Sequence, residues 1–273
     1  MDGIILQGQL PQHDRLGLGL TALSDKVANG LMSSTYISLS TAYHKSLDRD
    51  GNYSIAIGLQ GAYANRNIDG SKLVFDDELD NLGVFSQASG DAAKGRQLGR
   101  SYFDVSSGIL YKARLHKHHQ FYLGLSAYHL SGPRVSFMDR VELKVPLRLT
   151  LNGVYEWQAS DLLQLSLLAM YTRQEQASET VLGAIGAIGK SQRMFSRPLI
   201  LYAGILCRVQ DALIPYLGLE YRDVRFGFTY DLNTSALRAA TRGQGGAEVS
   251  LVYQLKLPPD KKRQYLCPDI PMF

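Results

Sequence analysis

The chain has 273 residues, of which 45% are apolar and 20% are charged, and its 29 basic and 25 acidic residues leave a net charge of +4. This apolar content excludes a largely disordered chain, and the balanced charge without a basic stripe argues against a nucleic-acid partner. The two cysteines, Cys207 and Cys267, fit neither a disulfide framework nor a zinc motif.

No apolar run approaches the ~18 residues of a membrane helix, since the best candidate, 162–171, contains Gln164 and Ser166. The N-terminal stretch MDGIILQGQLPQHDR lacks the basic start and the apolar core of a secretory signal. A helical membrane protein is therefore not expected, and either the protein is not exported or its beginning is missing.

The dominant pattern is alternation with a period of two, which predicts strands with one apolar face. Tyr53, Ile55, Ile57 and Leu59 alternate with Ser54, Ala56, Gly58 and Gln60. About twelve such segments of roughly 8 to 12 residues follow one another. In chain order they begin near Leu16, Ser33, Tyr53, Tyr102, Gln120, Leu147, Leu162, Thr180, Leu199, Leu213, Val224 and Gly246. The sequence therefore predicts an all-β protein.

The connections between these segments alternate in length. The tight ones are 44–52, 115–119, 158–161 and 222–223, and the long ones are 65–100, 131–146 and 233–244. Two others blur the contrast, since 189–198 is long for a tight side and 208–212 is short for a long side. An outer-membrane barrel has short periplasmic turns and long outer loops, so this alternation favours an antiparallel transmembrane β-barrel.

The faces of the strands favour a barrel over a soluble β-sandwich. A sandwich needs a charged outer face, whereas the second face here consists of Gly, Ser, Ala, Tyr and Gln, which suits a narrow lumen. Tyrosines also stand near the segment ends, where an interfacial aromatic girdle would need them. These are Tyr43, Tyr63, Tyr111, Tyr155, Tyr171, Tyr221 and Tyr230.

Several phrases of the sequence occur together in one order. They are Gly17 to Leu20 followed by Asp25-Lys26, Ala42-Tyr43-His44, GLQGAYANRNIDGSKLVFDDELD (58–80), YFDVSSGILY (102–111), YLGLSAYHLSGP (122–133), PYLGLEYRDVRFGFTYDLNTSAL (215–237) and GGAEVSLVY (245–253). Together they resemble the PorP/SprF family of the type IX secretion system over nearly the whole chain.

The resemblance implies an outer-membrane β-barrel of Bacteroidota-type bacteria that works without enzymatic chemistry in secretion, gliding motility or adhesin attachment. Its partners would be outer-membrane lipid, other type IX components and the C-terminal domains of cargo. Family members usually begin with a signal peptide and an additional hairpin, so the resemblance implies an N-terminally truncated chain and about 14 strands in a full-length member. No cofactor is expected.

The C-terminal segment departs from the family pattern. The family tends to end in a short Cys-Pro-x-Phe tail, whereas this chain reads CPDIPMF from Cys267 to Phe273. Prolines stop the last strand, so we divide the chain into a barrel domain, 1–257, and a periplasmic tail, 258–273. The tail is either a docking segment for periplasmic lipoprotein or ring proteins or a disordered extension.

Neither a metal site nor an enzyme active site is expected. His116, His118 and His119 lie in a tight turn that would splay their rings apart, and no carboxylate stands near them in the sequence. A solvated basic turn is the simpler interpretation. His44 and His129 have no serine or cysteine partner that the sequence places within reach.

Charged residues with inward parity form a candidate polar network in the lumen, because an ionisable group there must be hydrated or paired. They are Arg148, Glu156, Glu220, Arg225, Asp231 and Glu248. They would form a salt-bridged plug or line a channel, and the bulky inward tyrosines favour the plug. A diffusion or lipid-uptake channel stays an alternative function, as does a soluble β-sandwich binding module.

The long connection 65–100 is predicted to lie outside the cell, where it is a candidate for contact with a partner. Its stretch KLVFDDELDNLGVF mixes apolar anchors with acidic residues, as functional loops often do. The candidate contact residues are Leu73, Phe75, Asp76, Asp77 and Phe85. A lid folded over the barrel mouth is the alternative, and the two roles can coexist.

Overall fold

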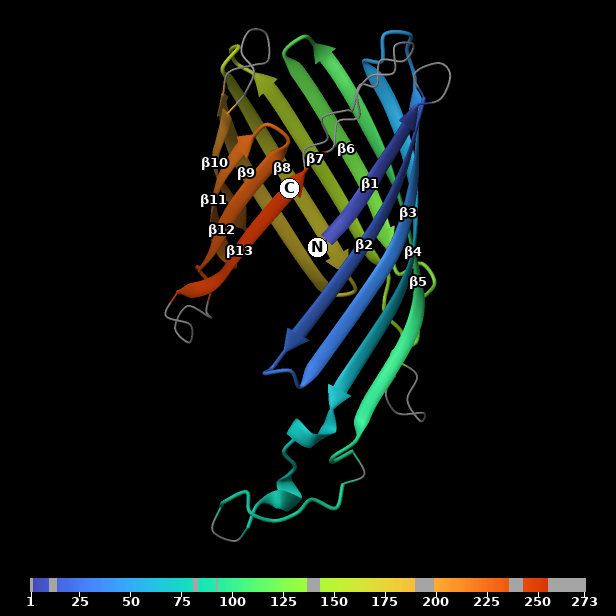
Figure 1. Cartoon of the computed structure of the whole chain (residues 1–273), viewed down its shortest axis with the longest axis vertical. Helices are drawn as coiled ribbons and strands as arrows, with labels where there is room; N and C mark the ends of the chain where they lie inside the picture. Colours follow the sequence, from blue (N-terminus) through green and yellow to red (C-terminus); the bar gives the residue numbers. More distant parts are fainter. Residues whose placement is uncertain are drawn as a thin grey trace.

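The computed structural model describes residues 2–9, 14–80, 83–91, 93–136, 143–189, 199–235 and 243–254. These residues form a single antiparallel sheet of 13 strands, in which each strand pairs with its neighbours in the sequence (Figure 1). The strands are β1 (Asp2–Gln9), β2 (Arg15–Val27), β3 (Met32–Ser46), β4 (Tyr53–Asp69), β5 (Gln97–His116), β6 (His119–Tyr128), β7 (Arg148–Gln158), β8 (Leu163–Gln174), β9 (Ala177–Gly189), β10 (Leu199–Arg208), β11 (Ala212–Tyr221), β12 (Val224–Asn233) and β13 (Gln244–Tyr253).

The predicted all-β, antiparallel organisation is confirmed, and each of the roughly twelve predicted segments is a strand of this sheet. Alternation missed one strand, β1, which pairs with β2 from Asp2↔Ala22 to Gln9↔Arg15. Its sequence DGIILQGQ places two isoleucines side by side, which interrupts the period of two. Pairing with the neighbouring strand, rather than a local pattern, makes this segment extended.

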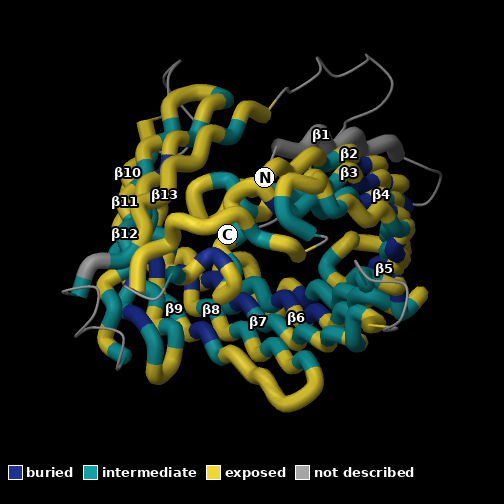
Figure 2. The backbone as a smooth tube through the Cα atoms, turned by 90° about the horizontal axis from the view of Figure 1, so that it is seen from below, coloured by how far each residue is buried: buried dark blue, intermediate teal, exposed yellow. Residues whose placement is uncertain are grey.

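The sheet curls into a ring, as the end-on view in Figure 2 shows. Within the described residues no ladder joins β13 to β1. Because 13 strands alternate in direction, β1 and β13 point the same way, so a ladder between these two edges would be parallel, unlike every other ladder in the sheet.

The outer face of the ring is apolar from β2 to β13. Phe103 is 75% exposed, Leu39 64% and Leu217 61%, and they lie on strands from different parts of the sheet. A water-soluble monomer rarely leaves so much apolar surface uncovered, so this face is suited to lipid. The structure thereby favours the barrel over the sandwich, which would bury its apolar faces against each other. Among the described residues, no helix is long and apolar enough to cross a membrane.

Aromatic side chains mark both edges of the apolar face. At the end with short turns, Tyr43, Trp157 and Tyr221 pair with Ile57, Leu165 and Val224 of the next strand. On that next strand, an outward tyrosine follows six positions later in all three cases, at Tyr63, Tyr171 and Tyr230. The two aromatic rows are therefore separated by about 20 Å along the strands, which suits a girdle at each membrane interface.

The three connections predicted to be long leave one end of the sheet, while the β9–β10 connection is the exception at the short-turn end. The connections after β4, β6 and β12 share the end with the long loops, and those after β3, β5, β7 and β11 share the opposite end. The β4–β5 hairpin is the longest, and Figure 1 shows it reaching well beyond the neighbouring strands. The tail 258–273 and its predicted docking role lie outside the described residues.

A buried carboxylate fixes the chain where it enters β2 at the short-turn end. Asp14 is 5% exposed and accepts hydrogen bonds from the Tyr43 hydroxyl at 2.5 Å, the Lys45 ammonium at 2.9 Å and the Ser46 backbone N–H at 3.1 Å. The bond from Tyr43, followed by that from Lys45, lowers the pKa of Asp14 to about 2. Its charged form is therefore favoured in the folded protein.

We expect Asp14→Asn to reduce stability at neutral pH and to lose this effect in acid. A carboxyl with a depressed folded pKa stabilises fully above its ordinary value of 3.8, and the stabilisation disappears as the pH falls through about 2. Urea unfolding of the wild type and the variant in detergent, from pH 7 to pH 2, should therefore converge at the acid end. Lys45→Met, which keeps the other two donors, should show a smaller difference. A gap for Asp14→Asn that persists at pH 2 would contradict this account.

Candidate functional site

The segment between β4 and β5, residues 70–96, is a folded outer loop. It contains two 3-10 turns, η2 (Gly70–Lys72) and η3 (Asp76–Glu78), and an antiparallel bridge between Leu79 and Phe85. Its base is tied to the sheet, since the Lys72 ammonium donates to the Asn29 carbonyl in the β2–β3 turn at 2.7 Å. These contacts give the described part of the loop a defined shape.

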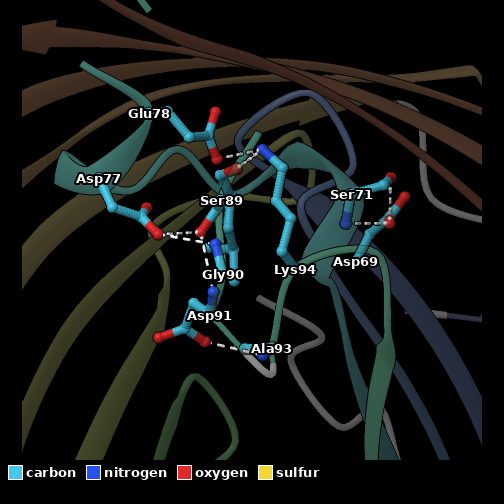
Figure 3. A network of polar contacts seen from close by, with 10 residues as sticks. Asp69, Ser71, Asp77, Glu78, Ser89, Gly90, Asp91, Ala93 and Lys94 are labelled. Carbon is cyan, nitrogen blue, oxygen red and sulfur yellow. Dashed lines mark hydrogen bonds and ion pairs between the residues drawn. The ribbon is translucent and has the colours of Figure 1, made fainter. Parts of the chain in front are cut away.

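Most acidic side chains of the outer loop cap its own backbone. Asp77 accepts from the Ser89 hydroxyl at 2.9 Å and the Gly90 N–H at 2.8 Å, and Asp80 accepts from the Val84 N–H at 2.9 Å (Figure 3 shows Asp77). The hydrogen bond from Ser89 is the main cause that lowers the pKa of Asp77. These carboxylates therefore organise the loop, as Asx-type caps do.

An ion pair joins the two halves of the outer loop. The Lys94 ammonium lies 2.5 Å from the carboxylate of Glu78, which is only 8% exposed, and it also donates to the Leu73 carbonyl at 2.6 Å (Figure 3). The Glu78 carbonyl accepts from the backbone of Ser86 at 3.0 Å. Because one side of the loop is held to the other at three points, its tip is presented on a firm base.

The structure changes which side chains of the outer loop are available for contact. Phe85 is exposed as predicted, and so is Asp76, but Leu73 and Phe75 are half-buried and Asp77 is engaged as a cap. The exposed apolar side chains around the bridge are Leu79, Val84 and Phe85, which we call the apolar tip. Leu79 and Val84 were not predicted. Composition indicated this loop as a candidate, and the bridge between Leu79 and Phe85 decides which of its side chains face outward.

In the lumen, the structure brings together two of the six predicted charged residues. Arg225 contacts Glu220 through Nη2 at 2.7 Å and Nε at 2.8 Å, and the Tyr202 hydroxyl donates to the same carboxylate at 2.8 Å. The Arg225 guanidinium also stacks over the Tyr202 ring at 4.7 Å. Tyr202 is one of the bulky inward tyrosines, and its contact with this ion pair depends on the register between β10, β11 and β12.

The other four predicted lumen residues lie apart from this pair. Arg148 stacks over Tyr128 at 4.4 Å, and Glu156 is 8% exposed near the opposite end of β7. Asp231 contacts Arg208 at 3.3 Å, whereas Glu248 on the edge strand β13 is exposed. The charges thus form separate local pairs, and a single network through all six residues is not what the structure shows.

A further buried pair was missed by the sequence analysis. Asp104 on β5 is 2% exposed, and it lies 2.8 Å from His129 Nδ1 and accepts from the Ser131 hydroxyl at 3.3 Å. His129 adopts a positive φ of 62° just after β6, so this contact fixes the start of the β6–β7 connection. The signal in the sequence was the inward parity of Asp104 among the small residues of its strand.

The wall of the lumen formed by β2 to β7 leaves a cavity of about 450 Å³. Its inward residues are small or carry neutral polar groups, among them Gly19, Ser40, Gly58, Gln60, Ser106, Gly108, Ser126 and Asn152. On the opposite wall, Val181, Ile185 and Ile214 are buried. The lumen is therefore hollow beside β2 to β7, whereas large apolar side chains pack beside β9 and β11, which we call the packed wall. In the part of the chain that the structure describes, no three His, Cys, Asp or Glu side chains are placed to hold a metal ion.

Comparison with known families decides what this barrel is. The family described as "type IX secretion system membrane protein PorP/SprF" matches residues 4–253, from the first described strand to the last residue of β13. The chain belongs to the PorP/SprF family. It is thus an outer-membrane component of the type IX secretion system, as the sequence resemblance indicated. A comparison with curated proteins finds no match.

We expect Arg225→Met in this PorP/SprF protein to destabilise the barrel by about 2 kcal/mol, because it leaves the mostly buried Glu220 carboxylate without its cation. The double variant Arg225→Met with Glu220→Gln should recover most of this loss. Urea unfolding midpoints in detergent measure both effects. Equal stability of the wild type and the single variant would show that lumen water replaces the ion pair.

Proposed function

We propose that this PorP/SprF chain works without enzymatic chemistry, as a binding or anchoring component for secreted cargo or adhesins, and that the apolar tip of its outer loop makes the contact. The observation that carries the proposal is the organisation of the loop. Most of its carboxylates are used internally, whereas Phe85 is 61% exposed, Val84 55% and Leu79 44%. An apolar cluster held on a firm base is typical of a protein contact surface.

The alternative role of this loop as a lid is less well supported by its position. The β4–β5 hairpin extends away from the barrel end in Figure 1, and its base is held to the β2–β3 turn by Lys72. The two strand segments that lead into the loop, 65–69 of β4 and 97–101 of β5, consist mostly of polar residues. These features support a loop that projects into the aqueous phase toward a partner.

The contact can be tested with Leu79→Ser, Val84→Ser and Phe85→Ser combined in the full-length protein in its native host. Because a few apolar anchors dominate most interfaces, we expect cargo display at the cell surface to fall by about tenfold. Co-purification with the C-terminal domains of cargo should fall in parallel. Heat-modifiable migration verifies that the barrel is folded.

Val209→Ser provides a matched control for this test. Val209 lies in the β10–β11 turn at the same end of the barrel, is 44% exposed and belongs to a different part of the rim. The control should leave display at the wild-type level. Unchanged display in the triple variant, with normal barrel folding, would remove the apolar tip from the proposal.

Membrane transport through the lumen is a second candidate function, and the cavity of about 450 Å³ is the observation that favours it. We propose instead that the lumen is plugged, because the packed wall and the pair of Glu220 with Arg225 fill part of it. Single-channel recordings of the purified protein in planar bilayers should therefore show conductance well below that of a general porin. Porin-level conductance would favour the diffusion or uptake channel.

A further inference from the structure

The histidine-rich turn between β5 and β6 presents an unusual concentration of positive charge at the short-turn end. Arg114, His116, Lys117 and His118 are all exposed there. The turn is held in place by its neighbours, since the Arg114 N–H donates to the Asn52 carbonyl at 2.8 Å and the His118 carbonyl accepts from the Gln158 N–H at 2.9 Å. We call these four side chains the basic turn.

The charges of the basic turn are not neutralised by carboxylates. None of its four side chains forms an ion pair or a side-chain hydrogen bond within the described residues. In the flanking β3–β4 turn, Asp48 is occupied by the backbone N–H groups of Asn52 and Tyr53 at 3.0 and 2.9 Å. Exposed acids remain at Asp50 and Asp161, one in each flanking turn. Two full cations and two imidazoles are therefore available to an anionic ligand.

An aromatic stack adjoins the basic turn on the lipid-facing side of β6 and β7. The His119 ring is stacked with Trp157, with centroids 6.4 Å apart and an angle of 5° between the planes, and with Tyr155 at 6.0 Å and 19°. The Tyr155 hydroxyl lies 2.7 Å from His119 Nδ1, so Nε2 is the nitrogen left for another partner. Leu123 and Leu125 continue this face along β6 and are exposed. The stack thus lies at the edge of the apolar face.

Three consecutive turns at this end also expose a leucine each. Leu47, Leu115 and Leu162 are 56%, 65% and 54% exposed, and they lie in or beside the β3–β4, β5–β6 and β7–β8 turns. Exposed apolar side chains next to free cations fit the boundary between acyl chains and headgroups, where each group finds its preferred surroundings. A surface that faced only water would gain nothing from these leucines.

We propose that the basic turn and the stack of His119, Tyr155 and Trp157 bind the phosphate of an anionic phospholipid in the leaflet at the short-turn end. Lys117 would contact the phosphate oxygens, His119 Nε2 would donate from the side, and the indole of Trp157 would lie at the level of the glycerol. Arg114, whose position on β5 faces the lumen side of the rim, would add positive charge nearby. This lipid binding would depend on the folded barrel and on none of the cargo contacts proposed above.

Trp157 offers a direct measurement, because it is the chain's single tryptophan. The folded full chain in a neutral detergent is titrated with brominated phosphatidylglycerol or with brominated phosphatidylcholine, whose acyl-chain bromines quench nearby tryptophan. We expect half-maximal quenching at a mole fraction of the anionic lipid at least about fivefold lower than that of the zwitterionic lipid. Equal quenching by the two lipids would overturn the proposal.

Variants identify the groups responsible for the preference. Lys117→Gln should reduce it about fivefold, since one cation near an anionic headgroup contributes about that factor, and Arg114→Gln should reduce it less. Arg222→Gln is the matched control, because Arg222 is a cation at the same end of the barrel but on the β11–β12 turn. It lies over an interfacial aromatic ring, 5.4 Å from the centroid of Tyr221. This variant should leave the preference at Trp157 unchanged.

Inorganic phosphate separates a lipid from a free anion. At equal ionic strength, inorganic phosphate and chloride should reduce the quenching of Trp157 to the same extent if the acyl chains and the headgroup of one lipid molecule bind together. Specific displacement by phosphate would identify a site for the free ion and would overturn the assignment to lipid, as would a preference that survives both Lys117→Gln and Arg114→Gln. Heat-modifiable migration of each variant confirms that the barrel is folded.

Discussion

The rest of this structure depends on one constraint, the need to hydrogen-bond every backbone N–H and C=O that lies among lipid tails. An unsatisfied peptide group costs several kcal/mol there, and a sheet meets the requirement by pairing each strand with its neighbours. The chain does this in the simplest order, with every strand beside the preceding one. All connections consequently lie at the two ends, where water can solvate them, and loops of different lengths do not disturb the sheet.

The sheet then divides its side chains between lipid and lumen, and small residues on the inner face make the division possible. Alanines such as Ala56, Ala62 and Ala64 are buried against the interior, while large aliphatic residues alternate with them toward lipid. Charges that face inward are found in local groups, with Arg225 beside Glu220 and His129 beside Asp104. Local pairing of Glu220 with Arg225 and of Asp231 with Arg208 needs no continuous network across the interior.

The two ends of the barrel use polar groups in opposite ways. In the outer loop, the carboxylates of Asp77, Asp80 and Glu78 are engaged by the loop's own backbone and by Lys94, and the exposed surface around the bridge between Leu79 and Phe85 is apolar. At the short-turn end, the basic side chains of Arg114 and Lys117 have no such partners among the described residues, so the surface that remains is charged. The apolar surface of the loop suits a protein partner, and the basic surface suits anionic headgroups. In both cases a partner can bind the side chains that make no contact within the fold.

The sequence by itself determined the strands, the face that each side chain occupies and the family, because alternation with a period of two is a local property and the family phrases are contiguous. It missed β1, since adjacent Ile4 and Ile5 break the alternation there. Only the tertiary structure decided which residues meet across strands. Tyr202 reaches Glu220 and Arg225 through the register of three strands, and the bridge between Leu79 and Phe85 decides what the outer loop exposes. Neither pairing leaves a local pattern, because both depend on backbone contacts between segments that the chain brings together only on folding.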